Sequence, residues 1–254
     1  TLGTGVAGLD KAIVNNSGSI NVQTGTLRLS SNAVAGEIGS GNGGHTVAGG
    51  ATLVFDGGTY NVGGAIAGAG ALSLTGARFT HTGAYTLSGA VLVNAGTANF
   101  NASTAMNASS IAIGGGTANF NGALTDGGTL TISTGTANFN AATSVAGALN
   151  LSGGTLSGSG VVTVNGTGSQ WTGGTMSGTG ATVISGTNTL EISGGTKFFT
   201  QRTLTTNGLT TWSGGAIGAG NGGTFNNNGT FDIQVNNSWV NSFGGSSTTL
   251  NNAG

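Results

Sequence analysis

Acidic side chains are the first candidates for chemistry in this sequence, because a pair of carboxylates carries out glycoside hydrolysis. None of the six acidic residues lies within ten residues of another, and we expect no two of them in one column on adjacent repeats. The sequence therefore argues against a hydrolase or lyase acting on polysaccharide, and we predict that the chain is not an enzyme. The six are Asp10, Glu37, Asp56, Asp126, Glu191 and Asp232.

Histidines and glycine-rich loops are the other candidates for a site. His45 and His81 are the only histidines, and we expect His81 to be an inward core or rim residue, because a metal site needs further ligands. The stretches 39–44 and 218–223 lack the aspartates of calcium-binding repeats and the lysine of a phosphate loop. We therefore interpret these stretches as turns and predict neither a metal ion nor a cofactor.

The elements that would position any such side chain follow a repeat of 19–21 residues. Each repeat contains the pattern apolar-x-apolar-x-Gly, with a further apolar residue two positions later. A fixed period of this size is typical of a solenoid, in which the middle apolar positions stack into one core column. That column is Phe55, Leu74, Val93, Ile113, Ile132, Leu151, Trp171, Ile192 and Trp212.

Alternation of apolar residues with Ser, Thr and Asn inside each repeat predicts short strands with one buried face. Glycine pairs mark the corners, where the backbone needs conformations closed to other residues. We therefore predict an all-β protein, a right-handed parallel β-helix of about 12–13 coils of 19–21 residues. Residues 1–254 would form one continuous solenoid, with an irregular, insertion-bearing coil at 30–52, and would be one unit of a longer fibre.

Three close copies of Gly-Thr-Ala-Asn-Phe-Asn lie between residues 96 and 140. Strand alternation directs their phenylalanines inward as a stack and their final asparagines into a ladder of side-chain amides. Their threonines would form an outward array like that of an ice-binding solenoid, but this array is expected to stop after three coils. The stack is Phe100, Phe120 and Phe139, the ladder is Asn101, Asn121 and Asn140, and the threonines are Thr97, Thr117 and Thr136.

One irregular repeat tests the register. The 21-residue step from Trp171 to Ile192 leaves Lys197 in an inward column, beside Phe198. A buried, unpaired ammonium is very costly. We therefore predict a local bulge that reverses the alternation and places Phe198 inside.

Charge and composition exclude several function classes. The net charge is −1 and 4% of residues are charged, which argues against nucleic-acid binding and against binding to anionic membranes. The sequence contains no run of 18 apolar residues, so we predict no membrane insertion. Cysteine is absent, and the expected surface of Asn, Thr, Ser and Gly is typical of secreted bacterial solenoids. The chain begins without methionine, so we expect a processed chain or part of a longer one.

The two ends of the sequence resemble each other. Residues 225–234 match residues 14–23 in the motif apolar-Asn-Asn-x-Gly-Ser/Thr-apolar-x-apolar-Gln, and residues 250–254 begin a third copy. We therefore expect self-association, as a head-to-tail filament or as covalent continuation of the same repeat. The contact would join Leu250, Asn251 and Asn252 to Thr1, Leu2 and Val14.

The strings 152–160 and 171–180 and the Asn-Asn-x-Gly repeats resemble the passenger regions of filamentous-haemagglutinin-like and autotransporter adhesins. That resemblance of repeat style covers most of the chain and implies a right-handed β-helix that forms a rod on or off the cell surface. It predicts a structural unit of an extracellular bacterial filament or adhesin rod, for adhesion or for cohesion of cells or matrix. A passenger domain that binds a host, a neighbouring cell or a glycan is the alternative, and a polysaccharide-active enzyme is a third. We do not expect the secretion-recognition cap of that family within this sequence, which leaves the export route open.

Overall fold

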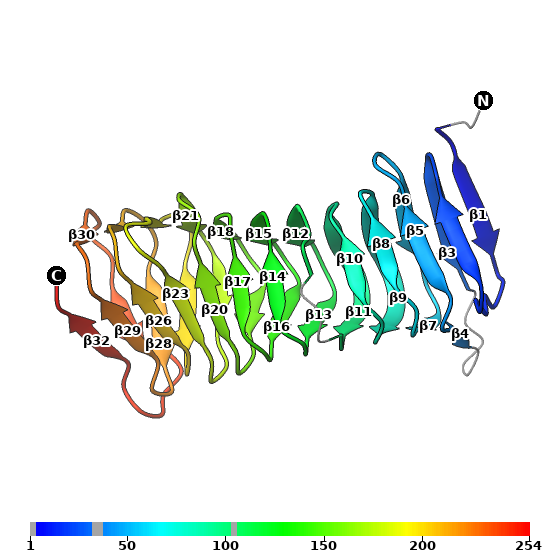
Figure 1. The fold of residues 1–254 in the computed structure, drawn as a ribbon. Coiled ribbons are helices and arrows are strands. Elements are labelled where there is room, and N and C mark those ends of the chain that lie inside the picture. The colour runs from blue at the N-terminus through cyan, green and yellow to red at the C-terminus, as the bar shows by residue number, and fades with distance from the viewer. Residues whose placement is uncertain (1–3, 32–37, 103–105) are drawn as a thin grey trace.

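The computed structural model describes residues 4–31, 38–102 and 106–254, and these contain strands but no helix. The strands stack into one elongated body with the two termini at opposite ends (Figure 1). Every pairing in the described residues is parallel, and the chain makes about 11 turns. The predicted parallel β-solenoid is thereby confirmed.

The first face is a ladder of twelve strands, one for each coil of the described chain. The path from the first strand of this ladder to the last makes about eleven turns and passes through twelve coils. Twelve coils agree with the lower end of the predicted range of 12–13. The ladder consists of β1 (Val6–Asp10), β3 (Thr26–Ser30), β6 (Thr52–Phe55), the first half of β9 (Ala71–His81), the first half of β11 (Val91–Phe100), β12 (Ser110–Ile113), β15 (Thr129–Ile132), β18 (Leu149–Leu151), β21 (Ser169–Trp171), β24 (Leu190–Ile192), β27 (Thr210–Trp212) and β30 (Phe231–Ile233).

The second face is a parallel ladder that uses the second halves of β9 and β11. Its other strands are β4 (Ile38–Gly41), β7 (Thr59–Val62), β13 (Thr117–Phe120), β16 (Thr136–Phe139), β19 (Thr155–Ser157), β22 (Gly174–Met176), β25 (Lys197–Thr200), β28 (Ile217–Gly220) and β31 (Trp239–Asn241).

The third face is divided into two parallel sheets. The N-terminal sheet contains β2 (Ser19–Val22), β5 (Gly44–Val47), β8 (Ile66–Gly68) and β10 (Tyr85–Leu87). The C-terminal sheet contains β14 (Leu124–Asp126), β17 (Thr143–Val145), β20 (Val161–Val164), β23 (Ala181–Ile184), β26 (Thr203–Thr206), β29 (Thr224–Asn227) and β32 (Thr249–Asn252). The apolar residues of the C-terminal sheet do not all lie in one column, since Leu124 pairs with Thr143 while Asp126 pairs with Val145.

The core column on the first face is continuous. All nine residues from Phe55 to Trp212 are buried, and each is the register partner of the next. The same line continues to Leu29 and Leu9 at one end and to Ile233 at the other. Burying a side chain of this size contributes roughly 1.5–3 kcal/mol, so the column is one of the main sources of apolar stabilisation of the rod.

The close copies in the middle of the chain stack as their spacing implies. The ring centroids of Phe100 and Phe120 are 5.2 Å apart, and those of Phe120 and Phe139 are 5.0 Å apart, with interplanar angles of 7° and 6°. Outside the core, the Asn121 amide donates to Asn101 at 2.8 Å, and the Asn140 amide donates to Asn121 at 2.7 Å. The stack lies inside and the ladder outside because neighbouring residues of a strand face opposite sides.

Glycine occupies corners where neighbouring coils approach most closely. Gly154 has a φ of 61°, and a Cβ on it would lie 2.2 Å from the carbonyl oxygen of Gly135. A Cβ on Gly128 would lie 1.5 Å from the carbonyl oxygen of Ser109. These corners therefore exclude any side chain, because real Cβ atoms do not approach backbone so closely.

The predicted inward position of Phe198 is wrong. Lys197 is fully buried, Phe198 is 38% exposed, and the next residue, Phe199, occupies the core. The Lys197 ammonium donates to the carbonyl oxygens of Gly195 at 2.8 Å and Gly214 at 2.7 Å, and also to that of Ser193. Three backbone acceptors thus pair the buried ammonium that was expected to be unpaired.

The physical reason is a corner lengthened by two residues. Met176 is the register partner of Phe199, so five residues separate Trp171 from Met176 but seven separate Ile192 from Phe199. A one-residue bulge would have reversed the alternation, whereas two added residues preserve it. The lengthened corner gives the interior a further column, in which Lys197 lies between Gly174 and Ile217.

The irregular coil near the N-terminus does not break the ladder. Leu29 pairs directly with Phe55 although they are 26 positions apart. The register pairs place most of the additional chain in the connection between β3 and β4 and the rest in the connection between β5 and β6. Residues 32–37 of that connection lie outside the described residues.

A charge placed in the phenylalanine stack should disrupt the fold. We expect Phe120→Asp to lower the free energy of unfolding by at least about 3 kcal/mol, because it removes a stacked ring and buries a carboxylate. Urea unfolding followed by circular dichroism measures the change. Thr117→Asp, on the outward side of the same strand, is the matched control and should cost less than about 1 kcal/mol. Equal losses in the two variants would contradict the assigned faces.

Candidate functional site

The acidic residues of the described chain lie apart and have separate roles. Asp10 and Asp56 both pair with the Arg28 guanidinium, at 2.9 and 3.4 Å, on the N-terminal coils of the first face. The Thr75 hydroxyl also donates to Asp56 at 3.0 Å. These carboxylates are bridged by a cation, so the trio is a surface ion-pair cluster that links coils.

The remaining acids do not form a pair either. Asp126 is buried on the third face, where one carboxylate oxygen accepts the Gly128 amide at 3.1 Å. Burial raises the pKa of Asp126, and the Gly128 bond opposes that shift. Glu191 accepts a hydrogen bond from Ser213, and Asp232 accepts one from Gln234. Glu37 lies outside the described residues, and the described acids offer no catalytic pair.

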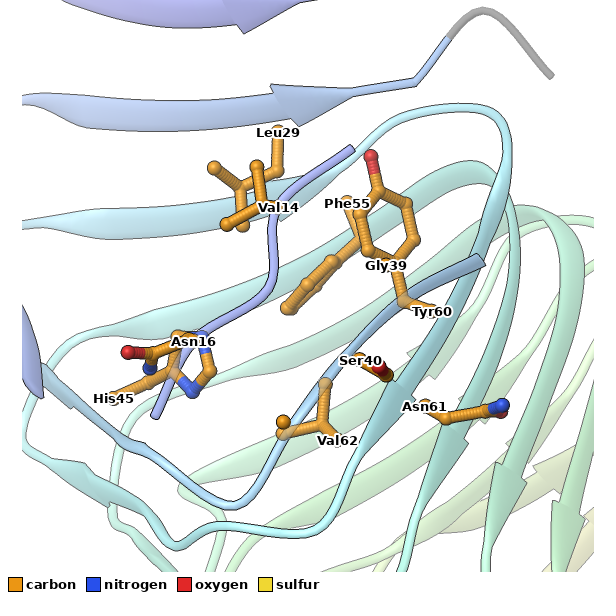
Figure 2. A pocket seen from close by; sticks show the side chains of 11 residues that line it. Val14, Asn16, Leu29, Gly39, Ser40, His45, Phe55, Tyr60, Asn61 and Val62 are labelled. Atoms are coloured by element: carbon orange, nitrogen blue, oxygen red, sulfur yellow. The ribbon is translucent and has the colours of Figure 1, made fainter. Parts of the chain in front are cut away.

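A small cavity lies at the N-terminal end, between the segment around Val14 and the coil that carries Tyr60 (Figure 2). Its space admits about one water molecule. The Tyr60 hydroxyl accepts the Ser31 amide at 2.8 Å, and Asn16 bonds the backbone of Gly18 and Gly44. This cavity is therefore too small for a substrate and belongs to the packing of the first coils.

Two buried histidines lie among aromatic rings in the N-terminal half. His81 is fully buried, stacks on Phe79 with ring centroids 6.2 Å apart, and meets Tyr85 edge-on at 5.8 Å. Its Nε2 lies 3.1 Å from the carbonyl oxygen of Gly64. Burial lowers the pKa of His81, and the hydrogen bond to Gly64 opposes that shift. The pKa of His45 is also lowered, mainly by burial and to a smaller extent by the nearby His81. Both rings are core residues, as expected for His81.

Arg202 is a second buried cation without a carboxylate partner. Its guanidinium donates to the Thr182 hydroxyl at 2.8 Å and to the carbonyl oxygens of Ala181 at 2.7 Å and Ser177 at 3.1 Å. A further bond of 3.4 Å reaches Gly158, so one side chain joins three successive coils. Burial lowers the pKa of Arg202 to about 10 and that of Lys197 to about 8, the latter shift being opposed by Glu191. Both cations act as internal caps for corner carbonyls.

The outward side of the second face carries a longer polar array than the sequence indicated. Register pairs extend the threonine column beyond the three expected coils to Thr155 and Thr175. Beside it, Asn119 donates to Asn99 at 2.8 Å and Asn138 donates to Asn119 at 2.7 Å. Each amide is held by its neighbour, so this side of the rod is regular and carries no charge in the column from Thr97 to Thr175, which follows the exposed Arg78.

The threonine column ends at an exposed aromatic pair. Phe198 is the register partner of Thr175, and its ring centroid is 5.6 Å from that of Phe243, at an interplanar angle of 76°. Phe243 is 43% exposed. A Cβ on Gly218, the next residue of the column, would lie 3.1 Å from the Phe198 ring, so the ring lies against the adjacent strand. Two neighbouring exposed rings are unusual on this otherwise polar surface.

The end coils expose the columns that are buried elsewhere. In the described residues, β1 and β2 pair on one side only, as do β30, β31 and β32. Leu9 at the N-terminal end is 44% exposed, while Ile233 and Leu250 at the C-terminal end are 56% and 49% exposed. Each end surface thus combines unpaired backbone groups with apolar side chains that have lost one neighbour.

Comparison with protein-family models, with curated proteins and with solved structures finds no match. The described residues contain no group of three or more His, Asp or Glu side chains that could hold a metal ion. No helix long and apolar enough to cross a membrane occurs among them. The surfaces of the chain itself, above all its two ends, are therefore the basis for a functional proposal.

Sequence reasoning missed the two cation caps and the exposed aromatic pair. The signal for the caps was present, because Lys197 stands at an inward position and Arg202 follows two residues after Thr200 at a coil corner. What no pattern showed was the set of carbonyl oxygens that the corners turn inward.

The buried histidines should make the N-terminal coils sensitive to acid. A histidine with a lowered pKa in the folded state binds its proton more readily when unfolded, so stability falls as pH drops below about 6.5. We expect His81→Gln to lessen this loss, by up to about 1.4 kcal/mol per pH unit. Guanidinium unfolding between pH 7.5 and 5 measures it, with Gln201→His, on the exposed surface, as a control for an added histidine. Identical pH profiles for the wild type and His81→Gln would contradict the role of His81.

Proposed function

We propose that this chain is a structural, non-enzymatic unit of an extracellular bacterial rod in which copies stack head to tail. The observation that carries the proposal is the state of the two ends. Within residues 4–254 as described, both are parallel edges paired on one side, with in-register apolar residues exposed, and such edges template the addition of further strands unless they are covered. A second copy presents the complementary edge, with the same strand direction and the same coil spacing.

Leu9 and Ile233 show why a second copy would stack end to end along the rod axis. They are the first and last described members of one column, so a copy placed on the C-terminal end would bring its Leu9 over Ile233 and restore the burial of both. The contact repeats one translation, so it does not close into a ring and produces an open filament. Covalent continuation by further coils of the same polypeptide would satisfy the same edges.

The extracellular part of the proposal rests on surface chemistry and on the resemblance in repeat style to secreted adhesin rods. The chain has 4% charged residues, no cysteine, and an outer surface of Thr, Asn and Ser ladders. A rod of this kind would act mechanically, as a thin fibre for adhesion or for cohesion of cells or matrix. Protease treatment of intact cells that carry the chain tests the location, since a surface rod is accessible to added protease.

The purified chain should form filaments as its concentration rises. We expect unbranched rods one solenoid wide, with an axial repeat of roughly 58 Å from twelve coils at about 4.8 Å each. Negative-stain electron microscopy and sedimentation measure the repeat and the association.

A charge on the end surface should stop this growth, because it would be buried without a partner at every joint. Ile233→Asp tests this, and Thr117→Asp on the side of the rod is the matched control that should leave growth intact. A wild-type chain that stays monomeric at all concentrations would overturn the filament and favour a passenger domain instead.

A second candidate function, glycan binding, is favoured by the exposed pair Phe198 and Phe243. Aromatic rings offer a large apolar surface, and here polar groups surround them: Thr175 precedes Phe198 in its column, and Ser242 lies beside Gly218. A pyranose ring could stack on Phe198 while its hydroxyl groups bond to these neighbours. In this role the rod would present a binding surface near its C-terminal end.

A glycan microarray of neutral bacterial and host oligosaccharides tests this second candidate. We expect Phe198→Ala and Phe243→Ala each to weaken binding at least tenfold, since each removes one of the two rings. Thr97→Ala, in the same column but far from the pair, should bind like the wild type. An array without signal for the wild-type chain removes this candidate.

A further inference from the structure

The third face determines the register of the joint between two copies. Tyr85 lies eight residues before the column residue Val93, and Leu124 lies eight residues before Ile132, so the two sheets of this face occupy equivalent places in the coil. Ile20 belongs to the line of Tyr85, through His45 and Ile66.

Leu250 belongs to the line of Leu124 on the same face. That line runs through Thr143, Val162, Thr182, Leu204 and Phe225 and reaches Leu250 in the last coil. Extending the ladder by one coil therefore brings Leu250 over Ile20, and not over Val14, which lines the cavity beside Tyr60 of the second face. The expected contacts of Thr1 and Leu2 lie outside the described residues.

The outward residue between these inward positions is an asparagine at both ends. Asn251 follows Leu250, and Asn21 follows Ile20; both side chains are exposed. The Asn251 amide donates to Asn226 at 2.8 Å. This leaves the carbonyl oxygen of Asn251 directed toward the open end as an acceptor.

The outer amide ladders have one polarity. Among the described residues, six amide–amide bonds on the outer surface have the asparagine of the later coil as donor to that of the earlier coil. The buried Asn227, on the inward side, donates in the opposite direction, to Asn252. A copy added at the C-terminal end supplies the coil that follows the last one, and its Asn21 would donate to the carbonyl oxygen of Asn251. The ladder on the third face can therefore continue across a joint without any change of rotamer pattern.

We propose, resting on the head-to-tail stacking above, that Asn21 of one copy donates to Asn251 of the preceding copy, with Ile20 packed on Leu250 and Leu9 packed on Ile233. The partner is a second copy of this chain, held by the strand edges of the first and third faces. The amide bond fixes the strand register of the joint, because a shift by one residue along the strand would place an asparagine against an apolar column. The apolar pairs supply most of the stabilisation, as they do between coils within one copy.

Disulfide cross-linking tests the register in a chain that has no cysteine of its own. Register partners on adjacent parallel strands lie about 4.8 Å apart, within the Cα separation of disulfides. The double variant Asn21→Cys/Asn251→Cys should polymerise on mild oxidation into a ladder of multiples of 24.2 kDa on a non-reducing gel. Thr205→Cys/Asn226→Cys, partners within one copy, should close internally without polymer and shows that the chemistry works.

The matched variant Ser17→Cys/Asn251→Cys places the thiol four residues away on the same end surface, and should cross-link at least tenfold more slowly. If electron microscopy shows filaments but the residue 17 variant cross-links faster than the residue 21 variant, this register is wrong while the head-to-tail rod remains supported. Absence of both filaments and intermolecular cross-links, with the internal control oxidised, would overturn the rod and the joint together.

Discussion

The in-register parallel ladder is the constraint on which the rest of the structure depends. Adjacent coils are held about 4.8 Å apart by backbone hydrogen bonds, so every residue meets its counterpart from the preceding coil. Side chains therefore act as columns: Phe120 packs on Phe100 and Phe139, and Asn121 bonds Asn101 and Asn140. The same spacing accounts for glycine at corners such as Gly128, where the preceding coil leaves no room for a Cβ.

Buried cations show how the interior adapts where the coil is enlarged. Longer corners turn carbonyl oxygens inward, where water cannot reach them, and unpaired carbonyls in that position are costly. Lys197 and Trp212 share the carbonyl of Gly214, and Arg202 donates to carbonyls of the two preceding coils. These donors satisfy groups that the ladder itself cannot, so the charge of the cation is held by backbone dipoles without a carboxylate.

The period of the sequence was sufficient to predict the fold and the first-face column, because the alternation of residues such as Ile111 and Ile113 repeats with little change in coil length. It was not sufficient for Lys197, since a corner longer by two residues and a bulge of one residue have the same local composition. The two matching end motifs show a second limit. Phe231 lies on the first face, whereas its counterpart Ile20 lies on the third. Local sequence determines where strands and turns form, but the number of residues since the last corner determines on which face of the coil a strand lies. The acidic residues lie apart for the same reason, since their positions in the coil differ.

The two-residue extension of the corner before Lys197 has a consequence for how such rods diversify. Coils of 19, 20 and 21 residues all keep the first-face column buried, so corners take up single residues and pairs of residues alike. Gene segments that encode coils can therefore gain or lose residues at corners while selection sees an unchanged core. Over many generations the cross-section of the rod becomes free to vary along its length, and the places where it widens, as around Phe198, are where new outer surfaces can arise without cost to the fold.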